Sequence, residues 1–145
     1  MEVSPLTADF NVQRDEFGRL PVDESLRLNG YNNIFVAGDG ARVLADDDHY
    51  ALMSCQHAIP QGKFAGHNAV NVMFGNAMKP YAQPQYATCL DLGEHALFTL
   101  GWERKLQLTG PEAKDLKMQI NTTWIYPSLD VEDTLTMSAP EEQNS

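Results

Sequence analysis

The chain has 145 residues, 43% of them hydrophobic, and a formal net charge of -10. This apolar fraction is large enough for a folded core, which excludes wholesale disorder. The acidic excess argues against nucleic acid and anionic membrane surfaces as main partners. The length suits one domain, or one domain with a tail.

The cysteines and the amino-terminal segment indicate where the protein resides. Cys55 and Cys89 are far apart in the sequence, so we expect reduced thiols rather than a disulfide scaffold. The opening "MEVSPLTADF" has no apolar run, so we expect no signal peptide. No window approaches the roughly 20 apolar residues of a membrane span. We therefore predict a cytoplasmic protein without membrane association.

The first third of the chain alternates turns with short extended segments. "DEFGRLPVDESLRL" predicts a turn at Gly18 followed by an extended piece, and "NGYNN" predicts a second turn. Residues 34–37, "IFVA", are all apolar and predict a short buried strand. Such a strand needs neighbours that this chain does not supply. It is either part of something larger or pairs across an oligomer interface.

A long helix is predicted over residues 54–76, because apolar residues recur along it in a broad pattern. Pro60 cannot donate a helical hydrogen bond, so it either kinks this helix or starts its regular part. Gly75 and Asn76 predict its end. A connector containing proline follows.

Three short runs, each ended by glycine, predict an antiparallel three-stranded meander over residues 87–110. Pro111 and Glu112 then predict the start of an amphipathic helix that continues to about Tyr126. Its apolar residues stand at helical spacing: Ala113, Leu116, Ile120 and Trp124.

These elements together predict an α+β fold with three parts. We expect residues 1–80 to hold the buried strand and the long helix, and residues 81–127 to form the meander and the carboxy-terminal helix. Residues 128–145 are acidic and predict a flexible tail.

Asp39 is the main candidate for ligand binding. It stands between Gly38 and Gly40, directly after the predicted strand. One interpretation is an ordinary turn, because glycine and aspartate are common in turns. In the other, the two glycines allow a ligand to approach the backbone. The carboxylate would then point into the crevice at the end of a strand and accept hydrogen bonds from hydroxyl groups.

The segments "GRLPVDESLR" and "NNIFVAGDGA" resemble the second flavin-binding signature of flavoproteins with two dinucleotide-binding domains. "MSCQHAIPQGKFAGHNAV" is similar to the helix after this signature in the NADH dehydrogenase-like branch of the pyridine nucleotide-disulfide oxidoreductases, and "LTGPEAKDLKMQINTTWIYP" resembles the carboxy-terminal end of some members. The resemblance implies a carboxy-terminal part of such a flavoprotein.

The resemblance also implies cofactor contacts. Gly38 and Asp39 would bind the ribityl chain of FAD. Backbone N–H groups around Cys55, Gln56 and His57 would face the pyrimidine edge of the flavin ring. A helix start offers unpaired donors and partial positive charge there.

The chain departs from the family in one respect. The family requires a G-x-G-x-x-G turn for FAD and a second one for the nicotinamide nucleotide, and neither occurs here. We therefore expect a longer parent that uses FAD and NAD(P)H, with Met1 not its natural start. The isolated chain is expected to be inactive, without FAD.

Other candidate sites are weaker. Cys55 at a helix start could be a redox thiol, although a packed or flavin-adjacent thiol is favoured. The acidic "ADDDHY" is interpreted as a solvated loop, and we predict neither a metal site nor a catalytic residue in this chain. Two hypotheses remain: a flavin-site wall with a homo-oligomer interface, or a non-catalytic dimerisation or docking module.

Overall fold

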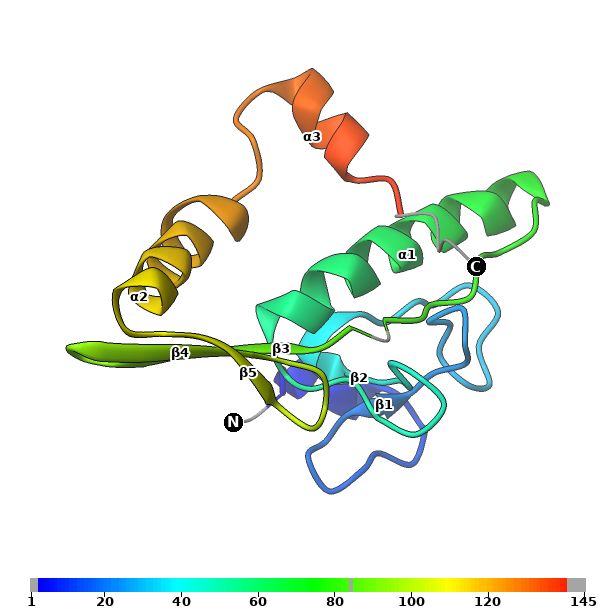
Figure 1. Ribbon diagram of the computed structural model, residues 1–145. Helices are drawn as coiled ribbons and strands as arrows, with labels where there is room; N and C mark the ends of the chain where they lie inside the picture. Colours follow the sequence, from blue (N-terminus) through cyan, green and yellow to red (C-terminus); the bar gives the residue numbers. More distant parts are fainter. Residues whose placement is uncertain (1–2, 84, 141–145) are drawn as a thin grey trace. The chain divides into compact units, whose positions relative to one another are not determined.

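The computed structural model describes residues 3–83 and 85–140 (Figure 1). It divides into two compact units, residues 1–83 with 138–145 and residues 84–137. The fold is α+β, as predicted, with three α-helices and an antiparallel three-stranded sheet among the described residues. None of the described helices combines the length and apolarity that a bilayer crossing requires.

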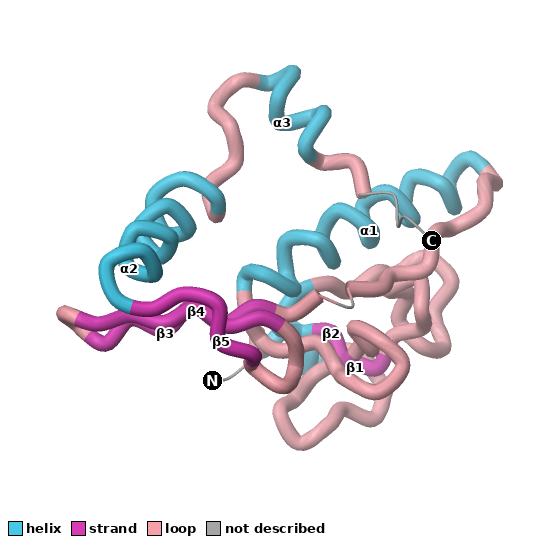
Figure 2. The backbone as a smooth tube through the Cα atoms, viewed as in Figure 1, coloured by secondary structure: helices cyan, strands magenta, loops and turns pink. Residues whose placement is uncertain are grey.

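The first unit consists mainly of turns and extended segments, with one long helix, α1 (Cys55–Phe74) (Figure 2). Strand β1 (Leu20–Pro21) pairs in parallel with β2 (Ala41–Arg42). Two single helical turns alternate with these strands in the sequence: η1 (Pro5–Asp9) precedes β1, and η2 (Gly38–Gly40) lies between β1 and β2. The core of the unit is built from small and aliphatic side chains together with two aromatic rings: Leu20, Leu26, Leu28, Ala41, Val43, Ala45, Ala51, Phe64, Ala65 and Tyr81.

Two turns of the same construction precede η2. In the first, Asp15 Oδ1 accepts hydrogen bonds from the N–H groups two and four residues later, at 3.0 and 2.8 Å. Asp15 Oδ2 accepts from Arg19 Nε at 2.7 Å. Asp23 repeats the pattern at 2.9 and 3.0 Å, with Arg27 Nε at 3.1 Å. The aspartate and arginine of the "VDESLR" signature therefore hold a turn.

The fourth residue of each turn has a positive φ. It is Gly18 in the first turn, at φ 81°, and Leu26 in the second, at φ 64°. A left-handed conformation is costly for a residue with a Cβ. Leu26 is completely buried, so the packing of its side chain offsets this cost.

The strand predicted over residues 34–37 differs from expectation. The segment is extended but only half-buried, and its pairing is a single antiparallel bridge between Phe35 and Arg27. Two backbone hydrogen bonds support the bridge, from Leu28 N–H to Ile34 O at 2.8 Å and from Val36 N–H to Leu26 O at 2.9 Å. A fully buried strand needs neighbours on both sides, and the described residues supply one.

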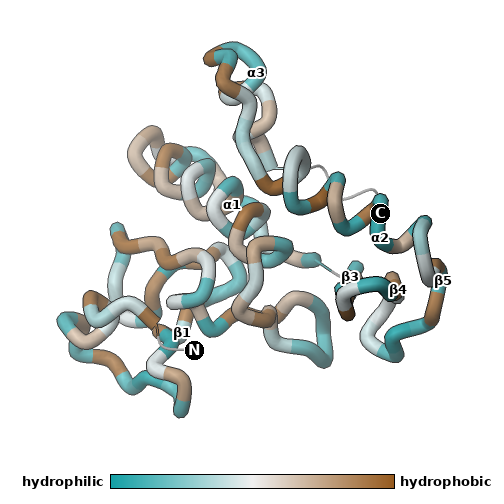
Figure 3. Tube along the Cα trace, turned by 90° about the vertical axis from the view of Figure 1, so that its left-hand side faces the viewer, coloured by the Kyte–Doolittle hydropathy of each residue, from teal (hydrophilic) through white to brown (hydrophobic). Residues whose placement is uncertain are grey.

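Helix α1 (Cys55–Phe74) confirms the predicted long helix and runs through Pro60. Gly75 ends it in the left-handed conformation, at φ 70°, as predicted. Hydrophobic and hydrophilic residues alternate along α1 (Figure 3). The buried face contains three polar side chains among the apolar ones: His57, Gln61, Phe64, Ala65 and Asn68.

The second unit confirms the predicted meander of β3 (Ala87–Leu92), β4 (His95–Leu100) and β5 (Lys105–Thr109), which pair antiparallel in sequence order. Helix α2 (Gly110–Gln119) packs on one face of the sheet, where Lys114 Nζ contacts Asp91 Oδ1 at 2.8 Å. The predicted helix continues past Gln119, but residues 120–124 form one π-helical turn instead of α-helix.

The predicted flexible tail contains a short helix, α3 (Val131–Met137), whose residues are all exposed. Asp130 Oδ1 accepts the N–H of Asp133 at 3.0 Å, which is a helix-capping contact. Glu132 and Asp133 lie in the first turn, where negative charge is favourable. Local capping therefore accounts for this helix, and residues 141–145 lie outside the described part of the tail.

Candidate flavin-binding wall

The Gly-Asp-Gly sequence forms η2, a single turn between the extended segment 34–37 and β2. Gly38 has φ 70°, and its carbonyl accepts the N–H of Ala41. Ala41 is the first residue of β2 and pairs with Leu20 of β1. The turn is thus fixed on its carboxyl side by the small parallel sheet.

The start of α1 lies against this turn. Gln61 Oε1 accepts the N–H of Gly38 at 2.7 Å. A Cβ added at Gly38 would lie 3.4 Å from the Cβ of Ala58, and one added at Gly40 would meet Thr7 at 3.6 Å. At these distances an added Cβ would make ordinary van der Waals contact, so the turn lies against the protein without requiring glycine for space. The close approach of a ligand, which the sequence interpretation assigned to these glycines, stays a prediction.

Asp39 is half-buried within this turn. No hydrogen bond or ion pair of its carboxylate is found among residues 3–83 and 85–140. Both carboxylate oxygens retain their full capacity to accept hydrogen bonds from a ligand or water. The structure thus places an acceptor that has no partner among these described residues beside the first turns of α1.

The three other predicted residues occupy the first turn of α1 in different environments. Cys55 is exposed, Gln56 is half-buried and His57 is completely buried. The N–H of His57 donates to the carbonyl of Ser54 at 3.1 Å. This amide is thus hydrogen-bonded within the helix start, and its contact with a flavin stays a prediction. The Ser54 side chain does not cap the helix.

Gln61 and Gln83 are residues of this region that sequence reasoning missed. The signal for Gln61 was its spacing, because it lies four residues after His57 on the same helical face. Gln83 Nε2 donates to the carbonyl of Gln56 at 2.8 Å. Nothing in the sequence pattern indicated this contact, because Gln83 lies in the connector beyond α1.

Burial changes the acid–base behaviour of two groups here. Burial lowers the pKa of His57 below its usual 6.5, and contact with the Gln83 side chain partly opposes this. His57 is therefore neutral at pH 7. Burial raises the pKa of Tyr81 above its usual 10.0, and the Gln61 side chain partly opposes this. Neither side chain adds charge beside the turn at neutral pH.

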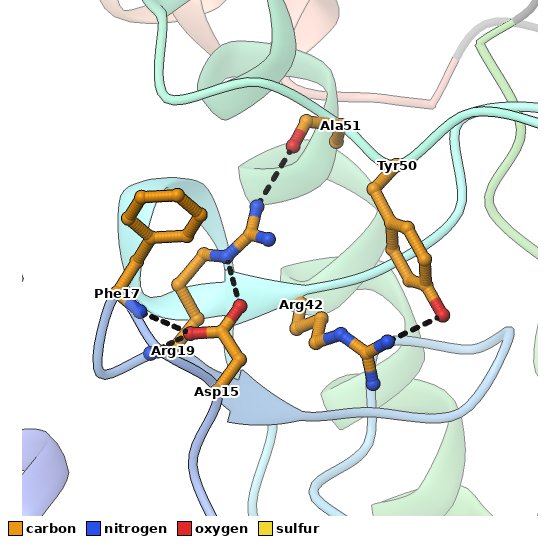
Figure 4. A network of polar contacts seen from close by, with 6 residues as sticks. All are labelled: Asp15, Phe17, Arg19, Arg42, Tyr50 and Ala51. Atoms are coloured by element: carbon orange, nitrogen blue, oxygen red, sulfur yellow. Dashed lines mark hydrogen bonds and ion pairs between the residues drawn. The ribbon is translucent and has the colours of Figure 1, made fainter.

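A polar network ties the first Asp–Arg turn to the segment that leads into α1 (Figure 4). Arg19 Nη1 donates to the carbonyl of Ala51 at 3.1 Å, while Arg19 Nε is ion-paired with Asp15 at 2.7 Å. Both charged side chains are largely buried, at 11% and 13% exposure. Arg42 stacks over the Tyr50 ring at 4.3 Å and donates to its hydroxyl at 2.9 Å.

The fold is α+β, and its candidate site is a Gly-Asp-Gly turn that lies against the start of a long helix. No family model matches the chain. An NADH dehydrogenase-like protein of Mycobacterium tuberculosis, found in two strains, is 44% identical to it over 146 aligned residues. The match covers 99% of this chain and 36% of the relative.

Type II NADH:quinone oxidoreductases of Staphylococcus aureus are also similar. One is 26% identical over 110 residues, which cover 75% of this chain and 27% of the relative. These matches confirm the resemblance drawn from the sequence: the chain corresponds to the carboxy-terminal part of an NADH dehydrogenase-like protein. It spans about a third of the length of the relatives that it matches.

Proposed function

We propose that this chain forms one wall of the flavin site in an FAD-dependent NAD(P)H oxidoreductase. The observation that carries the proposal is the hydrogen bond between Gly38 N–H and Gln61 Oε1, at 2.7 Å. It joins the turn that bears Asp39 to the helix that begins at Cys55, the two segments that the resemblance assigns to FAD. The similarity to NADH dehydrogenase-like proteins supports the same assignment.

The residues present fit a flavin on two counts. The Asp39 carboxylate has no internal partner among the described residues and can accept hydrogen bonds from ribityl hydroxyls. The first turn of α1 lacks a side-chain cap at Ser54, so backbone donors and the positive end of the helix dipole are available to an electron-rich ring edge.

These features assign separate roles to the cofactor and to the residues of this chain. Bound FAD supplies the hydride and electron chemistry. Within this chain, Asp39 holds the ribityl arm and Gly38 fixes the position of that carboxylate. The Cys55 and Gln56 peptides provide the positive field near the ring. The buried core behind the turn keeps water from that side of the site.

The test uses the complete polypeptide that the gene encodes. We expect it to bind FAD and its flavin absorbance near 450 nm (an approximate value for oxidised flavins) to bleach when NADH is added without oxygen. Bound FAD that NADH and NADPH both leave oxidised would contradict the reductase assignment.

A second candidate function is supported by an uncovered apolar surface. The sheet face opposite α2 carries Leu90 and Leu92, exposed at 44% and 61%, and Leu106, exposed at 59%. Cys89 Sγ lies 3.9 Å from Ala113 O, so the side chains that alternate with Cys89 point away from α2. Exposed apolar patches of this kind often mark interfaces between proteins.

We propose that a second copy of the chain covers this face, so that the unit serves as a homo-oligomer interface. Light scattering coupled to size exclusion should give a dimer or larger species. A Leu92→Glu variant should shift the protein to the monomer, whereas Leu129→Glu, at a fully exposed residue in the tail, should not. A wild-type monomer would contradict the interface role.

A further inference from the structure

Pro60 creates an unusual requirement at the start of α1. In a regular helix, the N–H of residue 60 would donate to the carbonyl of Gln56. Proline has no N–H, so this carbonyl loses its helical partner. The Gln83 side chain supplies the missing donor at 2.8 Å. A residue beyond the end of the helix thus completes the first turn and fixes the Gln56 peptide.

Gln61 performs the corresponding role for the Gly-Asp-Gly turn. Its Oε1 accepts the N–H of Gly38. Its side chain also acts on the Tyr81 hydroxyl, whose pKa it lowers against the effect of burial. The Tyr81 hydroxyl donates to Gln83 Oε1 at 2.8 Å. Gln61 and Tyr81 are only 1% and 5% exposed. Hydrogen bonds therefore join Gly38 to Gln61, and Tyr81 through Gln83 to the Gln56 carbonyl, while the Gln61 amide acts on the Tyr81 hydroxyl between these two links.

We propose that Gln61, Tyr81 and Gln83 are positioning residues that hold Gly38 and the Gln56 peptide at a fixed separation. The inference rests on the proposed function, because these two segments are the ones assigned to the flavin. The three side chains themselves are set behind the wall and touch no reacting atom. They determine where the ribityl acceptor lies relative to the backbone dipoles at the ring edge.

The chemistry of the three side chains favours a geometric role. A buried polar group costs free energy unless all its hydrogen bonds are made, so an apolar core would be at least as stable here. Directional hydrogen bonds at both ends of such a cluster fix the distance and orientation of the bonded groups, which apolar packing does less strictly. Tyr81 also packs edge-on against Phe64, with ring centroids 5.7 Å apart, so its hydroxyl is held in one place.

Asn68 provides a matched control on the same helix. It is completely buried, and it hydrogen-bonds the carbonyls of Ser25 and Lys79 and the N–H of Lys79, at 2.8 to 3.0 Å. It resembles Gln61 in burial and in bonding backbone groups through its side-chain amide. None of its contacts involves Gly38 or the first turn of α1. Its loss should therefore affect folding without moving the flavin wall.

The experiment compares Gln61→Leu, Tyr81→Phe and Asn68→Ala in the complete FAD-loaded polypeptide. We measure the Kd of FAD by flavin fluorescence, the visible spectrum and midpoint potential of bound FAD, and the Tm. Tyr81→Phe removes one hydroxyl from a ring that keeps its packing, so this variant should fold even if Gln61→Leu does not.

Gln61→Leu is expected to raise the Kd of FAD about tenfold and Tyr81→Phe about threefold, as the loss of single hydrogen bonds predicts. Both should shift the flavin spectrum and potential, whereas Asn68→Ala should lower only the Tm. The inference is overturned if Tyr81→Phe leaves Kd, spectrum and potential unchanged, or if Asn68→Ala alters them equally. Wild-type protein that binds no FAD would overturn the proposed function itself.

Discussion

Gly38 and Gly75 allow the cost of a strained backbone to be separated from the role of the Gly-Asp-Gly turn. Both have φ 70°, in the left-handed region that favours glycine. Gly38 faces the Cβ of Ala58 at 3.4 Å, whereas nothing lies within 4 Å of a Cβ added at Gly75. Gly38→Ala and Gly75→Ala therefore share the backbone cost and differ in what surrounds the new methyl group.

The magnitude follows from these positions. A Cβ in the left-handed region costs about 1–2 kcal/mol, so Gly75→Ala should lose about that much stability. At Gly38 the contact of 3.4 Å is close to ordinary van der Waals separation and adds little. If the turn relaxes and the bond to Gln61 is lost, a further ~1 kcal/mol follows. Each kcal/mol should lower the Tm by about 3 °C in a domain of this size.

The assay measures urea unfolding and FAD affinity in the complete polypeptide carrying each substitution. Both variants should be destabilised, but only Gly38→Ala should weaken FAD binding, because Asp39 moves with the turn. The reasoning would be refuted if both variants kept wild-type affinity, or if Gly75→Ala lost affinity to the same extent.

Three further outcomes test the contacts described above. Burial raises the pKa of Asp15, but hydrogen bonds from Arg19 outweigh it and hold the pKa below the usual 3.8. Asp15→Asn should therefore lower the free energy of unfolding by about 1 kcal/mol at pH 7. In denaturation curves, the difference between wild type and variant should vanish as the pH falls from 3.8 through the lower pKa of Asp15 in the folded protein. Gln83→Leu should lower the free energy of unfolding by about 1 kcal/mol. The loss should be smaller in a Pro60→Ala background, because an alanine N–H can reach the Gln56 carbonyl. A double-mutant cycle that shows no coupling between the two positions would contradict this. The hydrogen bond from Lys114 lowers the pKa of Asp91, so Lys114→Met should raise that pKa toward 3.8 in a carboxyl NMR titration.

The spacing of apolar residues, together with glycine and proline at the ends of elements, predicted the second unit well. The three glycine-terminated runs became β3, β4 and β5, and Pro111 lies at the start of α2. These signals are local, because a glycine after an alternating run and a proline at the first helical turn act within a few residues. The π-helical turn after Gln119 has no such signal, since its residues keep helical spacing.

The first unit was harder to predict because its structure depends on side chains that meet across long sequence distances. The apolar run over residues 34–37 predicted a buried strand, yet its burial depends on neighbours that pattern alone does not supply. The bond between Gly38 and Gln61 spans 23 residues. The one between Gln83 and Gln56 spans 27. A buried glutamine on an apolar helix face is ambiguous until its partner is known.

The Asp39 carboxylate tests the central claim most directly. The Kd of FAD should be measured for wild-type, Asp39→Ala and Asp47→Ala forms of the complete polypeptide, the last being an exposed acid in the neighbouring loop. A charged acceptor of hydroxyl hydrogen bonds contributes about 1.5–3 kcal/mol, so Asp39→Ala should raise the Kd about tenfold to a hundredfold, and Asp47→Ala should not change it. An unchanged Kd for Asp39→Ala would contradict the assignment of this turn to the flavin.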